Sequence, residues 1–405
     1  MLRFKKEDGS DYPNWEKRLL GDITKEIKRK ADTGSTAPIM MISQGKGFIY
    51  QSDKYSRENA GQSLAKYTLL KRGEMAYNHG ASKAKPYGVA YSLKEEEEAR
   101  VPFVYHSFEI IDGVTDYWNY ALNTTQMDRQ LKKLVSSGAR MDGLLNINYD
   151  TYMQTQIHTP CNEEQIKIAQ FLNKVDKKIE NQEKIIADYE KLQKCTMQKI
   201  FDQEIRFKDD NNISFPSWQE KQLGEVCTYR RGSFPQPYGL EEWYDDENGK
   251  PFVQVADVGD NMRLNPTTKR HISKLAESKS IFVKKGTMLI TLQGTIGKVA
   301  VTDYDAYVDR TLLILQNLNS EINIDYFKFA IWWIFNEEKK KADGSIIKTI
   351  TKETLTNFIV KIPCLDEQEK ISNCLSTINR KIEIEKAILE DWKELRKGLL
   401  QQMFV

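Results

Sequence analysis

Asp11-Tyr-Pro-Asn-Trp15 is matched 203 residues later by Ser214-Phe-Pro-Ser-Trp218, and this repeat decides the fold. The same shift places Pro160-Cys161 on Pro363-Cys364. Repeats of about 20 to 50 residues are typical of solenoids, whereas one repeat of half the chain indicates two fused copies of a domain. The sequence therefore predicts two similar modules in tandem, which can meet one partner at two separate places.

The composition is that of a globular chain with two domains of ordinary size, because 405 residues exceed one compact core. Basic and acidic residues nearly balance, 60 against 58, so a nucleic-acid contact has to come from local clusters of charge. The five cysteines form no Cys-x-x-Cys pair, which favours reduced thiols. Residues 1–10 hold no signal peptide, and the apolar run 326–335 is too short to span a bilayer. We expect a cytoplasmic protein with no membrane partner.

Each half ends in a long charged helix, expected over residues 163–201 and 366–404. Apolar residues recur there in alternating steps of three and four, at Ile168, Leu172, Val175, Ile179, Ile186 and Tyr189 and at Ile371, Leu375, Ile378, Ile382, Leu389 and Trp392. This spacing puts one apolar stripe on each helix and predicts that the two pack together as antiparallel rods of roughly 58 Å. A polar residue breaks each stripe, Gln182 and Glu385, and it either fixes the register or lies exposed at the edge of the seam.

The remaining parts, about residues 11–158 and 214–361, are rich in aromatic residues and prone to form strands. Strands are expected at residues 74–77 and 88–91 in the first part and at residues 252–256, 287–291, 299–301 and 311–315 in the second. One helix is expected in each part, opened by Asp116-Tyr-Trp and by Asp325-Tyr-Phe. The predicted fold class is α+β, with two similar mixed α/β domains joined by two long antiparallel coiled-coil helices in a pseudo-twofold arrangement.

The sequence shows no pattern of a catalytic site. Gly294-Thr-Ile-Gly-Lys298 lacks the spacing of a phosphate-binding loop, and no Asn-Pro-Pro-aromatic or Asp-Pro-Pro-aromatic run of an amino-methyltransferase occurs. The four histidines lie apart, with no nearby cysteine or aspartate at triad or metal spacing. We expect that the chain catalyses nothing by itself and holds no metal.

Loops that combine glycine with cations are the candidate sites for nucleic acid. In both halves a Lys-basic-Gly-x-Met turn precedes a strand, at Lys71 and at Lys284, and a loop of small residues with a cation follows that strand. Glycine lets the backbone approach phosphate, and amide or hydroxyl side chains can read base edges. A hairpin turn would explain any single loop of this kind equally well. The expected DNA-binding residues are Asn78, His79, Ser82, Lys83, Lys85, Arg140, Arg230, Arg231, Gln293, Thr295, Lys298, Arg310 and Lys348.

In the order of its parts, two globular domains each followed by a long helix, the chain resembles the specificity subunits of type I restriction–modification systems. The resemblance covers essentially the whole length. It rests on Pro-x-Trp-x-x-x-x-Leu-Gly at Pro13 and Pro216 and on Pro-Cys-x-x-Glu-Gln at Pro160 and Pro363. The loop 294–298 is also typical of the family, whereas Gly80-Ala-Ser-Lys83 departs from the Gly-x-Ile-Gly-Lys form.

The resemblance implies a division of labour along the chain. Residues 1–158 and 206–361 would be target recognition domains that each read one half of a bipartite site in double-stranded DNA. Residues 159–205 and 362–405 would be spacer helices that set the gap and dock two methyltransferase subunits. With restriction and motor subunits added, the complex would methylate adenine or cleave DNA. S-adenosylmethionine, ATP and Mg²⁺ would be bound by those partners, and no cofactor by this chain.

Two other functions stay open at this point. A non-catalytic coiled-coil scaffold with two protein-binding domains would share the repeat and the rods, but it would not need glycine–cation loops in both halves. An enzyme with an unrecognised site, such as a methyltransferase that acts alone, would show methyl transfer by the purified chain.

Overall fold

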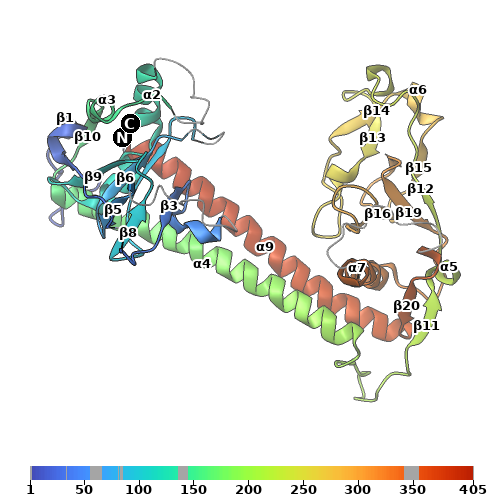
Figure 1. The fold of residues 1–405 in the computed structure, drawn as a ribbon. Helices are drawn as coiled ribbons and strands as arrows, with labels where there is room; N and C mark the ends of the chain where they lie inside the picture. The colour runs from blue at the N-terminus through green and yellow to red at the C-terminus, as the bar shows by residue number, and fades with distance from the viewer. Residues whose placement is uncertain are drawn as a thin grey trace. The chain divides into compact units, whose positions relative to one another are not determined.

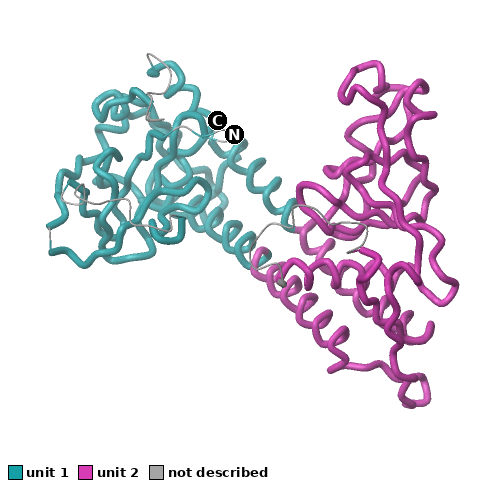
Figure 2. Tube along the Cα trace, turned by 45° about the vertical axis from the view of Figure 1, so that its right-hand side comes forward, with its two compact units in different colours: residues 1–182, 389–405 teal, residues 183–388 magenta. Residues whose placement is uncertain are grey.

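The computed structural model describes residues 2–32, 34–54, 66–80, 82, 85–135, 145–341 and 355–404. The chain forms two compact units, residues 1–182 with 389–405 and residues 183–388 (Figure 2). Each unit consists of one globular part and a segment of each of two long helices, α4 (Asn162–Phe201) and α9 (Leu365–Met403) (Figure 1). Both helices begin and end within one residue of the expected positions, and the mixed fold class with two long helices is confirmed.

The first globular part is built on a four-stranded antiparallel sheet in the order β2–β9–β6–β7. Its strands are β2 (Thr24–Glu26), β9 (His106–Ile110), β6 (Met75–Asn78) and β7 (Val89–Ser92). The two-stranded sheets are β1 (Glu16–Leu19) with β10 (Gln156–Thr159), β3 (Met40–Ser43) with β4 (Gly47–Tyr50), and β5 (Thr68–Lys71) with β8 (Glu98–Val101). The helices are η1 (Leu20–Ile23), η2 (Gln51–Asp53), α1 (Thr115–Ala121), α2 (Thr125–Leu134) and α3 (Tyr149–Met153).

The second globular part repeats this sheet in the order β12–β19–β16–β17 and adds another in the order β14–β13–β18–β15. The repeated sheet holds β12 (Thr228–Arg231), β19 (Leu312–Gln316), β16 (Met288–Thr291) and β17 (Val299–Val301). The added sheet holds β14 (Arg270–Ile272), β13 (Lys250–Val253), β18 (Ala306–Val308) and β15 (Ile281–Val283). The remaining elements are the pair β11 (Gln219–Gln222) and β20 (Ile359–Ile362), with α5 (Leu223–Val226), η4 (Glu241–Trp243), η5 (Val255–Asp257), α6 (Lys274–Glu277) and α7 (Ile324–Lys341).

One inner strand of each repeated sheet, β6 in the first part and β16 in the second, is buried on both faces. Met75 and Tyr77 of β6 face the core that holds the helices, whereas Ala76 faces a second core under β3 and β8. On β16, Met288 and Ile290 pack with α7, and Leu289 packs with β13 and β18. Successive strand residues point to opposite faces, so these short runs are apolar throughout rather than alternating.

The expectation of one helix in each globular part is wrong for both. The second part holds the short helices α5 and α6 besides α7, and the first part departs further. There, α1 is followed by α2 and α3 within the described residues. The helix α2 is amphipathic, with Met127 and Leu131 buried on one side and Lys132 and Lys133 in its last turn. Its apolar face is only two residues long, which is too weak a period to stand out in the sequence.

The repeated phrases of the sequence form a joint at the start of each long helix. In the second unit, the carboxylate of Glu367 accepts hydrogen bonds from Arg206 and from the Trp218 indole, and Gln368 Nε2 donates to Pro363 O at 2.8 Å. The amide oxygen of Gln368 also accepts from Asn323 N at 2.8 Å, just before α7. The first unit makes the same set of contacts with the residues 203 positions earlier, except that Gln165 accepts from Val114 N.

The long helices pack side by side within each unit. In the second unit, Lys386 Nζ lies 2.6 Å from the Glu190 carboxylate, and Gln193 donates a hydrogen bond to Asn379. Higher residue numbers on α4 meet lower ones on α9, so the two segments run antiparallel, as expected.

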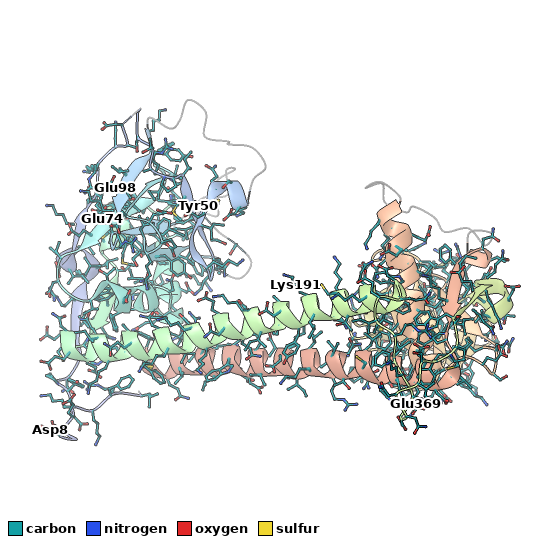
Figure 3. The ribbon with its side chains drawn as sticks, turned by 90° about the horizontal axis from the view of Figure 1, so that it is seen from below. Asp8, Tyr50, Glu74, Glu98, Lys191 and Glu369 are labelled. Atoms are coloured by element: carbon teal, nitrogen blue, oxygen red, sulfur yellow. The ribbon has the colours of Figure 1, made fainter. Side chains whose placement is uncertain are left out.

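The first unit contains the counterpart of one of these contacts. Arg396 Nε on α9 lies 2.5 Å from Asp176 Oδ1 on α4, and these two positions are 203 residues away from Gln193 and Asn379. The repeat therefore extends to the contacts between the helices. Many other polar side chains on the helices point outward, as labelled Lys191 does (Figure 3).

The polar breaks in the two apolar stripes are buried. Gln182 is 8% exposed and Glu385 is 7% exposed, so exposure at the edge of the seam is wrong for both. The carboxylate of Glu385 is held by Lys381 Nζ at 2.5 Å, one turn earlier on α9. A buried polar position in an apolar seam can penalise other registers, and this role stays a prediction for both residues.

No helix in the described ranges is both long enough and apolar enough to cross a membrane.

Candidate nucleic-acid interface

In the second unit, two strands of the added sheet end side by side. β13 and β18 run parallel, and Val253 and Val308 pair at their last positions. Asp309 N then donates to Val253 O at 3.0 Å, and Ser233 N donates to Val308 O at 3.0 Å. The loop after β12 is thereby tied to the end of the added sheet.

The repeated sheet ends at the same place. Gly232 N donates to Leu312 O at 3.0 Å, which places the end of β12 against the start of β19. Leu292 N donates to Thr311 O at 2.9 Å, which brings the loop after β16 beside the loop between β18 and β19. The loops that follow β12, β13, β16 and β18 therefore meet at one edge.

Six polar or aromatic side chains on these loops form what we call the strand-end cluster. All are exposed or half-buried. They come from four separate stretches of chain, and four of them are among the residues expected to bind DNA. The cluster consists of Arg231, Tyr238, Gln254, Gln293, Thr295 and Arg310.

Tyr238 lies at the centre of the contacts within the cluster. The guanidinium of Arg310 lies over its ring, 4.9 Å from the centroid, and Gln254 Nε2 donates to its hydroxyl at 3.4 Å. The ring of Phe234 packs edge-on at 5.3 Å and ties the phenol to the aromatic core beneath it. Tyr238 is nevertheless 45% exposed, so its outer face and both of its polar neighbours can be reached from solvent.

A buried carboxylate lies beneath the cluster. Asp309 is 1% exposed, and its Oδ1 accepts hydrogen bonds from Thr311 N at 2.8 Å and Thr311 Oγ1 at 2.6 Å. Burial raises the pKa of the Tyr238 phenol, and the charge of Asp309 adds to that effect. The phenol therefore stays protonated at neutral pH, and the exposed charge of the cluster is that of its arginines.

The predicted cations of this unit differ in whether their charge is compensated. Lys298 Nζ lies 2.6 Å from the Asp260 carboxylate. Arg230, Arg231 and Arg310 are exposed, and none of them has an ion pair with a carboxylate among the described residues. An uncompensated arginine keeps its full donor set and charge for an external partner, and phosphate or a guanine edge matches that geometry.

At the equivalent edge of the first unit, the described side chains of Asn78, Ser82 and Lys85 have partners within the unit. Asn78 ends β6, and its side-chain oxygen accepts from Gly80 N at 2.9 Å. Ser82 Oγ donates to Gln44 Oε1 at 2.7 Å. Lys85 Nζ donates to Asn123 O at 2.8 Å and lies 3.4 Å from Asp128. The Asn78 amide oxygen, the Ser82 hydroxyl and the Lys85 ammonium group are therefore already engaged in hydrogen bonds within the unit.

His79 lies inside the unit rather than on a DNA-facing loop. Its ring is 7% exposed, with Nδ1 2.8 Å from Leu145 O and Nε2 2.8 Å from Val104 O. It stacks on His106 with ring centroids 4.9 Å apart. The expectation that His79 offers its ring to DNA does not fit this arrangement, because both ring nitrogens face backbone carbonyls.

The comparisons with known proteins agree with this architecture. Residues 216–393 match the family of type I restriction modification DNA specificity domains. The chain is 23% identical to the MjaX specificity subunit of Methanocaldococcus jannaschii, in an alignment that covers 98% of this chain and 94% of that relative. It is 22% identical to the MjaVIII specificity subunit of the same organism, with the same coverage of both chains. The crystal structure of the type I restriction–modification S subunit of M. genitalium has a TM-score of 0.58 at 16% identity, covering 100% of this chain and 99% of that one.

Residues 216–393 match a type I restriction modification DNA specificity domain, and nearly the whole chain is similar to type I specificity subunits. The motifs that suggested this resemblance have structural roles in the chain, since Glu164, Gln165, Glu367 and Gln368 all make buried contacts at the helix joints. Within the described ranges, no three histidine, cysteine, aspartate or glutamate side chains are grouped so that they could hold a metal ion.

Three of the predicted DNA-binding residues, Lys83, Arg140 and Lys348, lie outside the described residues. Two members of the strand-end cluster, Tyr238 and Gln254, were not predicted. Tyr238 lies in the loop that opens with Arg231-Gly232, where the cations were singled out and the aromatic side chain was not, and Gln254 falls within a stretch expected to be a strand. Only the hydrogen bonds between distant strand ends bring them beside Arg310.

Proposed function

We propose that this chain directs a type I restriction–modification complex to a bipartite sequence in double-stranded DNA. Each globular part reads one half of that sequence. The observation that carries the proposal is the strand-end cluster, which gathers amide, hydroxyl and uncompensated guanidinium groups at one edge of the second unit. Such groups bond to base edges and phosphates.

The repeat supports reading at two places. The sheet order and the joints recur in both halves, whereas the loops at the strand ends differ in length and sequence. A shared frame with unshared loops suits two modules that recognise different targets. On this proposal the residues expected in the first half, Asn78, Ser82, Lys83, Lys85 and Arg140, serve the other half-site.

The long helices, on this proposal, set the gap between the half-sites and dock two methyltransferase subunits. Apolar side chains are exposed at equivalent positions of both helices: Ile185 and Ile388 are 40% and 36% exposed, and Leu192 and Leu395 are 49% and 48% exposed. Leucine and isoleucine that remain accessible at positions repeated 203 residues apart suit a partner that binds twice.

Catalysis and cofactors belong to the partners in this proposal. Methyltransferase subunits bind S-adenosylmethionine, and the restriction and motor subunits bind ATP and Mg²⁺; this chain binds none of them. The cytoplasmic location expected from the sequence stays a prediction.

A swap of one recognition domain tests the proposal. Residues 214–361 are replaced by the corresponding residues of a relative with a different target, and the hybrid is expressed with its methyltransferase subunits in a host whose DNA lacks this methylation. Sequencing of methylated adenines should show one half of the site changed and the other unchanged. A site in which both halves change, or neither, contradicts the modular reading.

The spacing role has its own test. An insertion of four residues, about one helical turn, in α4 should lengthen the gap that the complex accepts between half-sites. An unchanged gap would remove the role of the helices in spacing. Purified chain that binds protein partners but shows no preference among DNA sequences would favour the scaffold instead, and methyl transfer by the chain alone would establish an enzyme.

A further inference from the structure

We propose that Tyr238 is a positioning residue that orients Arg310 to read a guanine and Gln254 to read an adenine in the half-site of the second unit. The inference rests on the proposed function and names the residues that determine its specificity. It starts from two contacts with one phenol: the guanidinium over the ring at 4.9 Å and the amide on the hydroxyl at 3.4 Å.

The phenol restricts the freedom of two long side chains. Arginine and glutamine on a surface sample many rotamers, and ordering them on DNA costs free energy that a preformed contact reduces. The face of the Tyr238 ring holds the Arg310 guanidinium by a cation–π contact, and the ring itself is held by Phe234. The hydroxyl fixes one end of the Gln254 amide.

The side chains of Arg310 and Gln254 match different bases. Arg310 keeps all of its N–H donors, because no described carboxylate pairs with it, and two parallel donors match O6 and N7 of guanine in the major groove. The Gln254 amide has two N–H donors and one acceptor oxygen; one N–H donates to Tyr238, and the other N–H and the oxygen match N7 and N6 of adenine. Tyr238 touches each of them through a different part of its side chain, so the two contacts can be separated by substitution.

Three variants separate them in the full chain, co-purified with its methyltransferase subunits. Tyr238→Phe keeps the ring under Arg310 and removes the hydroxyl that accepts from Gln254. Arg310→Lys keeps the charge but removes the planar pair of donors. Gln254→Ala removes the amide alone. The matched control is Leu240→Ala, an exposed apolar residue on the same loop that is 42% exposed.

The readout is the base composition of the bound site, measured by selection from a randomised duplex pool and by sequencing of methylated adenines. Arg310→Lys should lower the preference for one guanine about tenfold, within the range of a single bidentate contact, and leave the other half-site unchanged. Gln254→Ala should do the same at one adenine. Tyr238→Phe should reproduce the Gln254→Ala pattern and spare the guanine, which a merely structural role for Tyr238 would not do.

The outcomes also separate this inference from the proposed function. A wild-type chain with no two-part site would defeat the proposed function. A two-part wild-type site whose base preferences survive Arg310→Lys, or a Tyr238→Phe variant that loses the guanine and keeps the adenine, would overturn the inference alone. Because Tyr238→Phe and Arg310→Lys leave the aromatic core in place, the unchanged half-site serves as the internal control for folding.

Discussion

The guanidinium of Arg206 and the carboxylate of Glu367 form a two-contact ion pair, with Nε 2.8 Å from Oε1 and Nη2 2.9 Å from Oε2. The Glu367 side chain is completely buried, whereas that of Arg206 is 28% exposed. Trp218 Nε1 donates to the same carboxylate at 2.9 Å. The pair holds the segment around Arg206 against the first turn of α9. The hydrogen bond to Glu367 raises the pKa of Arg206.

Arg206→Met should destabilise the second unit strongly. The substitution leaves the buried carboxylate of Glu367 without its counter-charge, and breaking a buried pair on one side costs about 3 kcal/mol or more. Urea unfolding at neutral pH measures the loss. Lys370→Met is the control, because Lys370 pairs with Asp210, whose side chain is 95% exposed, and such a pair contributes about 1 kcal/mol at most. Equal losses of unfolding free energy in Arg206→Met and Lys370→Met would contradict a stabilising role of the buried pair at the joint.

Much of the fold could be predicted from the sequence because the repeat compares the chain with itself. Residues 203 positions apart agree where a buried contact requires them, as at Trp15 and Trp218 or Glu164 and Glu367. The stripe of apolar residues likewise predicted α4 and α9, since its period persists for nearly forty residues. The small helices α2 and α3 were missed because each buries only two residues.

The site was predicted less well because exposed loops carry no periodic signal. Glycine and lysine marked the loop at Lys298, but the structure compensates that charge with Asp260, which lies 38 residues earlier in the chain. His79 has a polar side chain among small residues, yet two backbone carbonyls hold it inside. Tyr238 and Gln254 gain their place from strand pairing between distant segments, which no local pattern records.

Gly232→Ala should disturb the strand-end cluster through the backbone. A Cβ at Gly232 would lie 2.3 Å from Val308 O and 2.4 Å from Asp309 O, so β12 and the loop that carries Arg310 must move apart. We expect a loss of about 1–3 kcal/mol in stability, as in other overpacked sites. DNA binding should weaken several-fold, measured by titration of the chain and its methyltransferase subunits with a duplex that carries the selected site.

The control for that substitution is Gly286→Ala, in the turn before β16. Its φ of +85° makes alanine strained, but no atom lies within 4 Å of the added Cβ. The strain costs roughly 1–2 kcal/mol, and the strand-end cluster is untouched. Stability should fall while DNA affinity stays at the wild-type value. A Gly232→Ala variant that binds DNA as tightly as the Gly286→Ala variant would argue against a role of the strand-end cluster in DNA binding.

His106 should make the first unit less stable as the pH falls below 6.5. Burial lowers the pKa of His106 beneath its ordinary value of 6.5; electrostatic repulsion between the His106 and His79 rings adds to this, while the Ile147 carbonyl and Glu26 oppose it. The groups packed around the ring are Tyr77, His79, Tyr149 and Tyr152.

The sign follows from proton binding. Between pH 6.5 and the lower pKa of the folded state, the unfolded chain binds the proton and the folded chain does not, so the free energy of unfolding decreases as the pH falls. One proton gives a slope of about 1.4 kcal/mol per pH unit at most. In His106→Asn the slope of unfolding free energy against pH should flatten between pH 5 and 7 relative to the wild-type chain, and an unchanged slope would contradict the prediction.

A chain with its ends joined should fold, because the first unit holds its two ends as the second unit holds a continuous segment. Leu2 N donates to Gln402 O at 2.8 Å, and Ile205 N donates to Lys199 O at 3.1 Å, at positions 203 residues apart (Figure 1). Three residues connect Phe201 to Ile205, so one residue inserted between Val405 and Met1 gives the same count between Phe404 and Leu2. New ends are placed at the exposed turn between residues 211 and 212.

The joined variant should unfold at nearly the wild-type temperature and direct methylation to the same site. The connection added in the first unit and the bond removed between residues 211 and 212 of the second leave the number of chain connections unchanged, so the change of chain entropy in one unit is offset in the other. The control opens the joined chain between Leu289 and Ile290, in the middle of buried β16, and should not fold. Aggregation of both variants, or a shifted methylation site in the first, would mean that the contact between the two ends is not equivalent to the continuous segment.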